Sequence, residues 1–124
     1  MEFSTEEVAQ PEQVPEQTVV SDCNAVNGYG WDTRIAYAVC MAESGGIASK
    51  DNAGLNYDGS VDYGLMQVNS IHAGMVGGDV EQLRDPQTNI RVAYAVYQGS
   101  LERTGDGWKA WSAYNNGKYL NFLN

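Results

Sequence analysis

Two carboxylic acids, Glu43 and Asp62, are the residues of this chain best suited to acid–base chemistry. Glu43 lies near the end of a predicted helix, where the negative end of the helix dipole disfavours a charged carboxylate. If apolar side chains also cover it, burial raises its pKa further, and the group can act as a general acid near neutral pH. Asp62 alternates with Val61 and Tyr63 along a predicted strand, so it points away from both. Two such acids can cleave a glycosidic bond, and a solvated surface position is the alternative for each.

Helical spacing of apolar residues predicts the elements that carry these acids. One helix leads up to Glu43, a long helix occupies the second half of the chain, and two short helical pieces follow it. The two longer helices begin at aspartates suited to N-capping, Asp32 and Asp85, and Gly45 is expected to end the first. The predicted helices cover residues 32–44, 86–103, 108–114 and 118–122.

A small hairpin is predicted between the first two helices. Asp58-Gly59 is a turn pair flanked by short β-prone arms, so we expect one strand on each side of it. Asp62 lies on the second of these strands. The fold class is therefore α+β, mainly α, with one small β-hairpin.

Charge divides the chain into two parts. The 124 residues contain 16 acidic and 7 basic side chains, which gives a net charge of −9. Residues 1–22 contain six acidic residues and no basic one, together with Pro11 and Pro15, and we predict that they form a disordered acidic linker. Residues 23–124 then form one domain. The acidic balance argues against nucleic acid as a partner, and no apolar run approaches the roughly 20 residues of a membrane span.

The two cysteines, Cys23 and Cys40, are compatible with one disulfide formed outside the cytoplasm. Two reduced, buried thiols are the alternative, because the sequence gives no geometry. A structural zinc usually takes four ligands, and His72 is the only histidine, so no metal or other cofactor is predicted. We expect the three tryptophans to pack mainly in the core, with stacking on sugars as the alternative. They are Trp31, Trp108 and Trp111.

Four short motifs follow one another along the chain: Glu43-Ser44, Gly64-Leu65-Met66-Gln67, Asp85-Pro86 with Asn89-Ile90, and Ala113-Tyr114-Asn115-Asn116-Gly117. In order and spacing they resemble the motifs of soluble lytic transglycosylases, which belong to the lysozyme-like superfamily. The segment 58–70 is also similar to the hairpin of c-type lysozymes and of the small transglycosylases that accompany secretion and conjugation machines. The resemblance covers roughly residues 31–120 and implies the lysozyme-like fold, with a central helix ending at the catalytic Glu.

The resemblance implies cleavage of the β-1,4 bond between N-acetylmuramic acid and N-acetylglucosamine in peptidoglycan. In the transglycosylase route, Glu43 protonates the leaving oxygen and then acts as base on the muramic C6 hydroxyl, which closes a 1,6-anhydro ring. In the lysozyme route, Asp62 is the second carboxylate and water completes the hydrolysis, a division of roles for which lysozyme is the standard example. An inactive peptidoglycan-binding module is the third possibility, and retention of Glu43 argues against it.

The resemblance also implies contacts to substrate. Gln67 and Asn69 would line the cleft, with a role in capping and fold as the alternative. Tyr114 resembles a family tyrosine whose hydroxyl lies near the catalytic Glu, with a core tyrosine as the alternative. Asn115 belongs to the same motif. Ser44 is expected to support the turn after the first helix and could bond substrate.

The implied partner is the peptidoglycan glycan strand, and the implied location is the cell wall, the periplasm or the extracellular space. Residues 1–22 lack the basic and apolar regions of a secretory signal, so export would require a signal absent from this sequence. An acidic domain gains no long-range attraction to an anionic wall. Tethering through the N-terminal linker to other domains or to a cell-envelope machine is therefore expected to aid recruitment.

Overall fold

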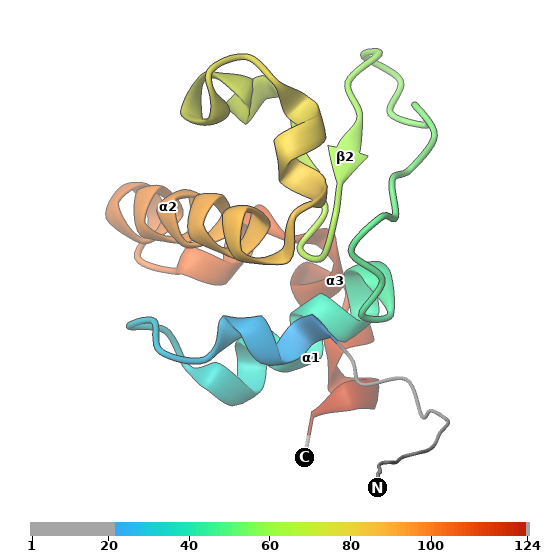
Figure 1. Cartoon of the computed structure of the whole chain (residues 1–124). Helices are drawn as coiled ribbons and strands as arrows, with labels where there is room; N and C mark the ends of the chain where they lie inside the picture. The colour runs from blue at the N-terminus through green and yellow to red at the C-terminus, as the bar shows by residue number, and fades with distance from the viewer. Residues whose placement is uncertain (1–21, 124) are drawn as a thin grey trace, which may run out of the picture.

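In the computed structural model, which describes residues 22–123, helices of different lengths form most of the fold, and one two-stranded sheet lies to one side of the longer helices (Figure 1). The prediction of an acidic linker falls almost wholly on residues 1–21, which lie outside the described range. The longer helices are α1 (Thr33–Ser44) and α2 (Pro86–Thr104), and α3 (Ser112–Asn115) is one turn long. The strands are β2 (Asp62–Tyr63) and β3 (Val68–Asn69), and the 3-10 helices are η1 (Asp22–Val26), η2 (Ser70–Val76), η3 (Val80–Arg84), η4 (Gly107–Ala110) and η5 (Lys118–Phe122).

Helix α1 begins and ends where its capping residues predict. The Asp32 carboxylate accepts hydrogen bonds from the backbone N–H groups of Arg34 and Ile35, at 3.0 and 3.3 Å. Gly45 follows the helix at a φ of 66°, and its N–H donates to the Met41 carbonyl. The predicted helix over residues 32–44 is confirmed, and Glu43 lies in its last turn.

Helix α2 confirms the second predicted helix. The Asp85 carboxylate accepts a 2.9 Å bond from the backbone of Thr88, and Pro86 occupies the first turn. The predicted piece over 108–114 is instead two short helices, η4 and α3, because Trp111 between them is extended at φ −112° and ψ 125°. The piece predicted over 118–122 forms as η5.

The predicted position of the hairpin turn is wrong. The strands pair Asp62 with Asn69 and Tyr63 with Val68, so the turn is residues 64–67 and not Asp58-Gly59. Around Asp58, the side chain accepts bonds from the backbone and hydroxyl of Ser60, which closes a local turn without pairing the flanking arms. The true turn contains buried Leu and Met, so it lacks the polar composition by which turns are usually identified.

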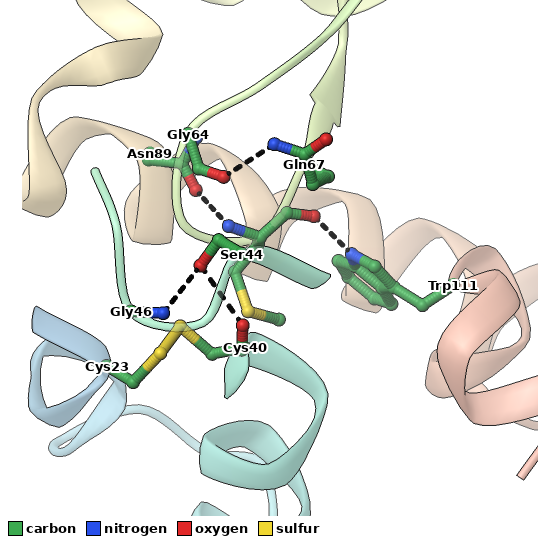
Figure 2. Close-up of a disulfide and its surroundings, with 9 residues drawn as sticks. Cys23, Cys40, Ser44, Gly46, Gly64, Gln67, Asn89 and Trp111 are labelled. Carbon is green, nitrogen blue, oxygen red and sulfur yellow. Dashed lines mark hydrogen bonds between the residues drawn. A yellow bond between two sulfur atoms is a disulfide. The ribbon is translucent and has the colours of Figure 1, made fainter. Parts of the chain in front are cut away.

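An aromatic cluster and a disulfide hold the helices together. Trp31 stacks on Trp108 with ring centroids 5.2 Å apart, and its ring edge meets Tyr94 and Tyr97. The predicted core positions of Trp31, Trp108 and Trp111 are confirmed, since each is 5% exposed. The bridge Cys23–Cys40 links η1 to α1, which decides between the two alternatives for the cysteines (Figure 2).

The hairpin and η2 lie on one side of α2, and α1 lies on the other (Figure 1). This arrangement places the end of α1 and the hairpin on opposite sides of the site described below. Within residues 22–123, no helix combines the length and the apolar character needed to cross a membrane.

Candidate active site

A cleft of about 830 Å³ runs between the end of α1, the hairpin with the loop before it, η2, α2 and the start of α3. It brings together Glu43 and Asp62, which lie 19 positions apart in the sequence and on different elements. Polar and aromatic side chains line this space together with apolar ones, as in most ligand-binding sites. They include Gln67, Asn69, Trp111 and Ser112.

Glu43 is partly buried, and burial raises the pKa of its carboxyl group above the ordinary value. The negative charge of Asp62 raises this pKa as well, whereas the backbone N–H of Ala113 and the charges of Lys50 and Lys118 lower it. The N–H of Ala113 donates to Glu43 Oε2 at 3.3 Å and so orients the carboxyl group. With burial as the largest effect, Glu43 keeps its proton to a higher pH than an ordinary glutamate, as a general acid requires.

Asp62 is held in a different way, by three asparagine side chains. The amides of Asn52 and Asn56 donate to Oδ2 at 3.0 and 3.2 Å, and the amide of Asn69 donates to Oδ1 at 2.9 Å. Asn52 also accepts a bond from the Asp62 backbone N–H through its side-chain oxygen. The three amide bonds fix the carboxylate in one orientation at the wall of the cleft, and the fourth bond ties the backbone of Asp62 to Asn52.

Gln67 and Asn69 both line the cleft, as predicted, but their amide nitrogens bond within the protein. Gln67 donates to the Gly64 carbonyl at 3.0 Å and has a φ of 50°, an unusual conformation for a residue other than glycine. Asn69 donates to Asp62 and to the Ser60 hydroxyl, and its oxygen caps η2 at Ile71. Substrate contacts by these two residues stay a prediction, alongside their observed structural bonds.

Three predicted substrate contacts are not part of the cleft lining. Ser44 is buried, and its hydroxyl donates to the Cys40 carbonyl and accepts from the Gly46 N–H, so its expected support of the turn is confirmed (Figure 2). The amide of Asn115 donates to the Lys109 carbonyl at 2.8 Å. The ring of Tyr114 stacks on Tyr119, and burial and the charge of Asp106 raise the pKa of its hydroxyl.

Asn89 lies outside the cleft but fixes the hairpin turn to the helices. It is fully buried, its oxygen accepts from the Met66 N–H, and its amide donates to the carbonyls of Tyr63 and Leu83, at 2.8 to 2.9 Å. Gly64 is required at the turn, since a Cβ there would overlap the Leu83 carbonyl oxygen and the Asn89 amide. Trp111 completes the link by donating from Nε1 to the Met66 carbonyl at 2.8 Å (Figure 2).

Most of the groups that control Glu43 and Asp62 could not be identified from the sequence. The roles of Asn52 and Asn56 could have been suspected from their polar side chains clustering before Asp62, in a loop with little apolar content. The contacts of Glu43 with Ala113, 70 positions away, and the charge of Lys118 carry no local sequence signal. Within residues 22–123, no group of three or more His, Cys, Asp or Glu side chains is arranged to hold a metal ion.

Comparison with known proteins identifies the family. Residues 23–121 match the family described as Transglycosylase SLT domain. Invasion protein IagB of Salmonella typhimurium is 33% identical over 107 residues, which cover 81% of this chain and 65% of that protein. Protein IpgF of Shigella flexneri is 31% identical over 103 residues, with coverage of 78% and 66%.

A Peptidoglycan-binding-like protein of Escherichia coli O157:H7 is 31% identical over 91 residues, covering 64% of this chain and 53% of that protein. The chain thus spans less than two thirds of the length of each of these three relatives. No solved structure gives a significant match. The family match covers nearly all described residues and includes Glu43 and Asp62, and the chain therefore belongs to the SLT transglycosylase domain family.

Proposed function

We propose that this protein is a peptidoglycan lytic transglycosylase, which cleaves the β-1,4 bond between N-acetylmuramic acid and N-acetylglucosamine and forms 1,6-anhydro-N-acetylmuramic acid. The observation that carries the proposal is Glu43, a partly buried acid with a raised pKa that lines the cleft of an SLT-family domain. The catalytic domain in this proposal is residues 23–124.

Glu43 first transfers its proton to the glycosidic oxygen, and the bond from that oxygen to the muramic C1 breaks. The carbonyl oxygen of the substrate's own acetamido group bonds to C1 and takes up the developing positive charge. Glu43, now a carboxylate, removes the proton from the C6 hydroxyl, and the C6 oxygen displaces the acetamido oxygen from C1. No water is consumed, and Glu43 regains its proton for the next cycle.

The surroundings of Glu43 suit both of its tasks. Burial favours the protonated form needed in the first step. The N–H of Ala113 and the charges of Lys50 and Lys118 favour the carboxylate, which must persist until the C6 hydroxyl is in place. The carboxyl group thus has neighbours that favour each of the two forms through which it alternates as acid and base.

A muramidase that hydrolyses the same bond is the second candidate, and the bonding of Asp62 favours it. A carboxylate fixed by three amides could stabilise the oxocarbenium-like transition state or attack C1. An inactive peptidoglycan-binding module is the third candidate, supported by the name of the Escherichia coli relative. The retained acid with its raised pKa weighs against it.

Because the proposed substrate is peptidoglycan, the proposed location of the protein is the periplasm or the cell wall. The Cys23–Cys40 disulfide fits an oxidising compartment outside the cytoplasm. In this proposal residues 1–22 are an acidic linker to other domains or to a cell-envelope machine, and the strands of the wall are the partner. No cofactor takes part in the proposed steps.

Mass spectrometry of the muropeptides released from purified peptidoglycan tests the proposal. The wild type and the Asp62→Asn variant should both release products that are one water lighter than hydrolytic products and end in the 1,6-anhydro ring. Reducing-end products that disappear with Asp62→Asn would establish the muramidase. If neither the wild type nor Glu43→Gln releases any product and both still bind the wall, the protein is a binding module.

A further inference from the structure

The charges that line the cleft differ between its two ends. The acids Glu43, Asp58 and Asp62 all belong to the end of α1 or to the hairpin region. The basic side chains in the lining are His72 from η2 and Arg103 from the last turn of α2. The chain has a net charge of −9, yet a cation lines its cleft. The proposed chemistry does not use this cation.

The guanidinium of Arg103 is available to a ligand. It lies back over Gly99, one helical turn earlier, where a Cβ built on Gly99 would come within 3.3 Å of Arg103 Nη1. This places the guanidinium along the cleft-facing side of α2, since Gly99 itself lines the cleft. Among residues 22–123, the ion pairs of arginine involve only Arg34 and Arg84, so no described carboxylate pairs with Arg103.

His72 is the neighbour of Arg103 in the cleft. Burial and the positive charge of Arg103 hold the pKa of His72 below its usual range. The imidazole is therefore neutral near pH 7, and it can donate one hydrogen bond while Arg103 supplies the charge. The two side chains form a basic corner, defined here as His72 and Arg103 over Gly99.

We propose that this basic corner binds a carboxylate of the wall strand and so fixes which part of the strand lies along α2. The inference rests on the proposed function and names a recognition element of the same cleft. The acids near the reacting bond repel carboxylates, whereas a guanidinium presents paired N–H donors that match one. A carboxylate on the strand therefore binds most favourably at the Arg103 end of the cleft. The neutral sugar backbone then lies beside Glu43 and Asp62.

Two parts of a wall strand carry this chemistry. Stem peptides have free carboxylates, and a muramic acid without a peptide has a free lactyl carboxylate. Chitotetraose offers the same acetamido sugars with no carboxylate. These three kinds of probe separate recognition of a carboxylate, and of its source, from recognition of the sugar backbone.

The test uses the full chain with Glu43→Gln, so that bound strands stay intact, and measures dissociation constants by calorimetry. The probes are a peptidoglycan tetrasaccharide with stem peptides, the same tetrasaccharide without them, and chitotetraose. Arg103→Gln is added to the Glu43→Gln chain. The matched control is Arg91→Gln, an exposed arginine of the same helix that is not part of the cleft lining.

Arg103→Gln should weaken binding of a carboxylate-bearing tetrasaccharide about tenfold, which corresponds to the loss of one charged hydrogen-bonded contact. Binding of chitotetraose and all binding by the Arg91→Gln control should stay unchanged. A loss confined to the peptide-bearing probe assigns the corner to a stem carboxylate, and a loss confined to the peptide-free probe assigns it to the lactyl group. An equal loss for chitotetraose, or no loss for any probe, overturns the inference.

The two proposals fail in different ways. If the wild type releases anhydro products from peptidoglycan and Arg103→Gln binds every probe as tightly as its parent, the carboxylate site is overturned and the proposed function stands. If the wild type releases no product from peptidoglycan and no probe binds, the proposed function is overturned and the carboxylate site with it.

Discussion

Glu43 and Asp62 are held in the cleft by opposite kinds of surroundings. Glu43 projects from the last turn of α1, is partly buried, and accepts one hydrogen bond, at 3.3 Å from the Ala113 backbone. Asp62 lies on a two-residue strand and accepts three amide bonds of 2.9 to 3.2 Å. The surroundings of Glu43 act mainly on the pKa of its carboxyl group, whereas those of Asp62 fix the orientation of its carboxylate.

This difference separates the roles that the two acids can take. An acid that must give up a proton and take one back needs few fixed bonds and a raised pKa, as at Glu43. An acid bonded to three amides cannot turn toward substrate without losing those bonds, each worth roughly 1 kcal/mol. Asp62 is thus better suited to act through its charge at a fixed position than to transfer a proton.

Glu43→Gln should produce the largest change in activity. The amide preserves the size of the side chain but has no acidic proton to donate to the glycosidic oxygen, so release of muropeptides should fall roughly 10²- to 10⁴-fold. The rate is measured by clearing of a peptidoglycan suspension. Glu102→Gln, at an exposed acid on α2, is the control and should clear it at the wild-type rate.

A Glu43→Gln protein that clears the suspension as quickly as the wild type would show that the acid of α1 is not the proton donor. Thermal unfolding of the variant at neutral pH should occur at a temperature no lower than that of the wild type, because the carboxyl group makes one long bond to the protein and burial disfavours its charged form.

Asn89→Ala should break the connection between the two walls of the cleft. The change leaves the Met66 N–H and the carbonyls of Tyr63 and Leu83 without their buried partner, so we expect the free energy of unfolding to fall by roughly 3 to 5 kcal/mol. Urea unfolding measures the loss. Asn115→Ala, which removes one exposed bond to Lys109, should cost well under half as much.

A loss in Asn89→Ala no greater than in Asn115→Ala would mean that the hairpin turn is held in place by packing alone. The same measurement bears on Asp62, because the turn positions the strand that carries it.

The sequence predicted the helices of this fold better than the hairpin. Capping residues such as Asp32 and Gly45 act within one turn of chain, so they can be identified locally. The turn at residues 64–67 depends on Asn89, more than 20 positions away, to satisfy its buried backbone. The local turn signal at Asp58-Gly59 therefore predicts a turn but not the position of the hairpin.

The same distinction applies to the candidate site. The place of Glu43 at the end of a helix could be predicted locally, whereas the burial that raises its pKa depends on tertiary packing and was only a condition of the prediction. The asparagines around Asp62 and the basic corner at Arg103 arise from segments that meet only in the folded chain. The catalytic candidates could be predicted from residue type, but the contacts that set their pKa and orientation are formed only by the tertiary structure.

Asp62→Asn should shift the pH dependence of activity. The general acid works while it is protonated, so kcat/KM is lost as the pH rises through the pKa of Glu43. Asp62 raises this pKa through its charge, so its removal should move the alkaline limb of the profile to lower pH. Asp22→Asn, in η1 and outside the cleft, should leave the limb in place. An unmoved limb in Asp62→Asn would show that the two acids do not interact.

Lys50→Met should shift the same limb in the opposite direction and by less. The charge of Lys50 lowers the pKa of Glu43, and its effect ranks below that of Asp62. Without it the acid keeps its proton to higher pH, so the alkaline limb of kcat/KM should move upward. Lys109→Met removes an exposed cation that does not affect Glu43 and serves as the control.

Lys50 Nζ also donates to the Glu43 backbone carbonyl at 3.0 Å, so the variant loses a bond at the end of α1 as well as a charge. High salt separates the two effects, because it screens an exposed charge but leaves a hydrogen bond largely intact. Salt also screens Asp62, whose charge shifts the pKa of Glu43 in the opposite direction, so the two proteins are compared with each other at each salt concentration. If the charge of Lys50 is responsible, raising the salt concentration should narrow the difference between the alkaline limbs of Lys50→Met and the wild type. A difference that persists at high salt would instead assign the effect to the lost bond and to the position of Glu43 at the end of its helix.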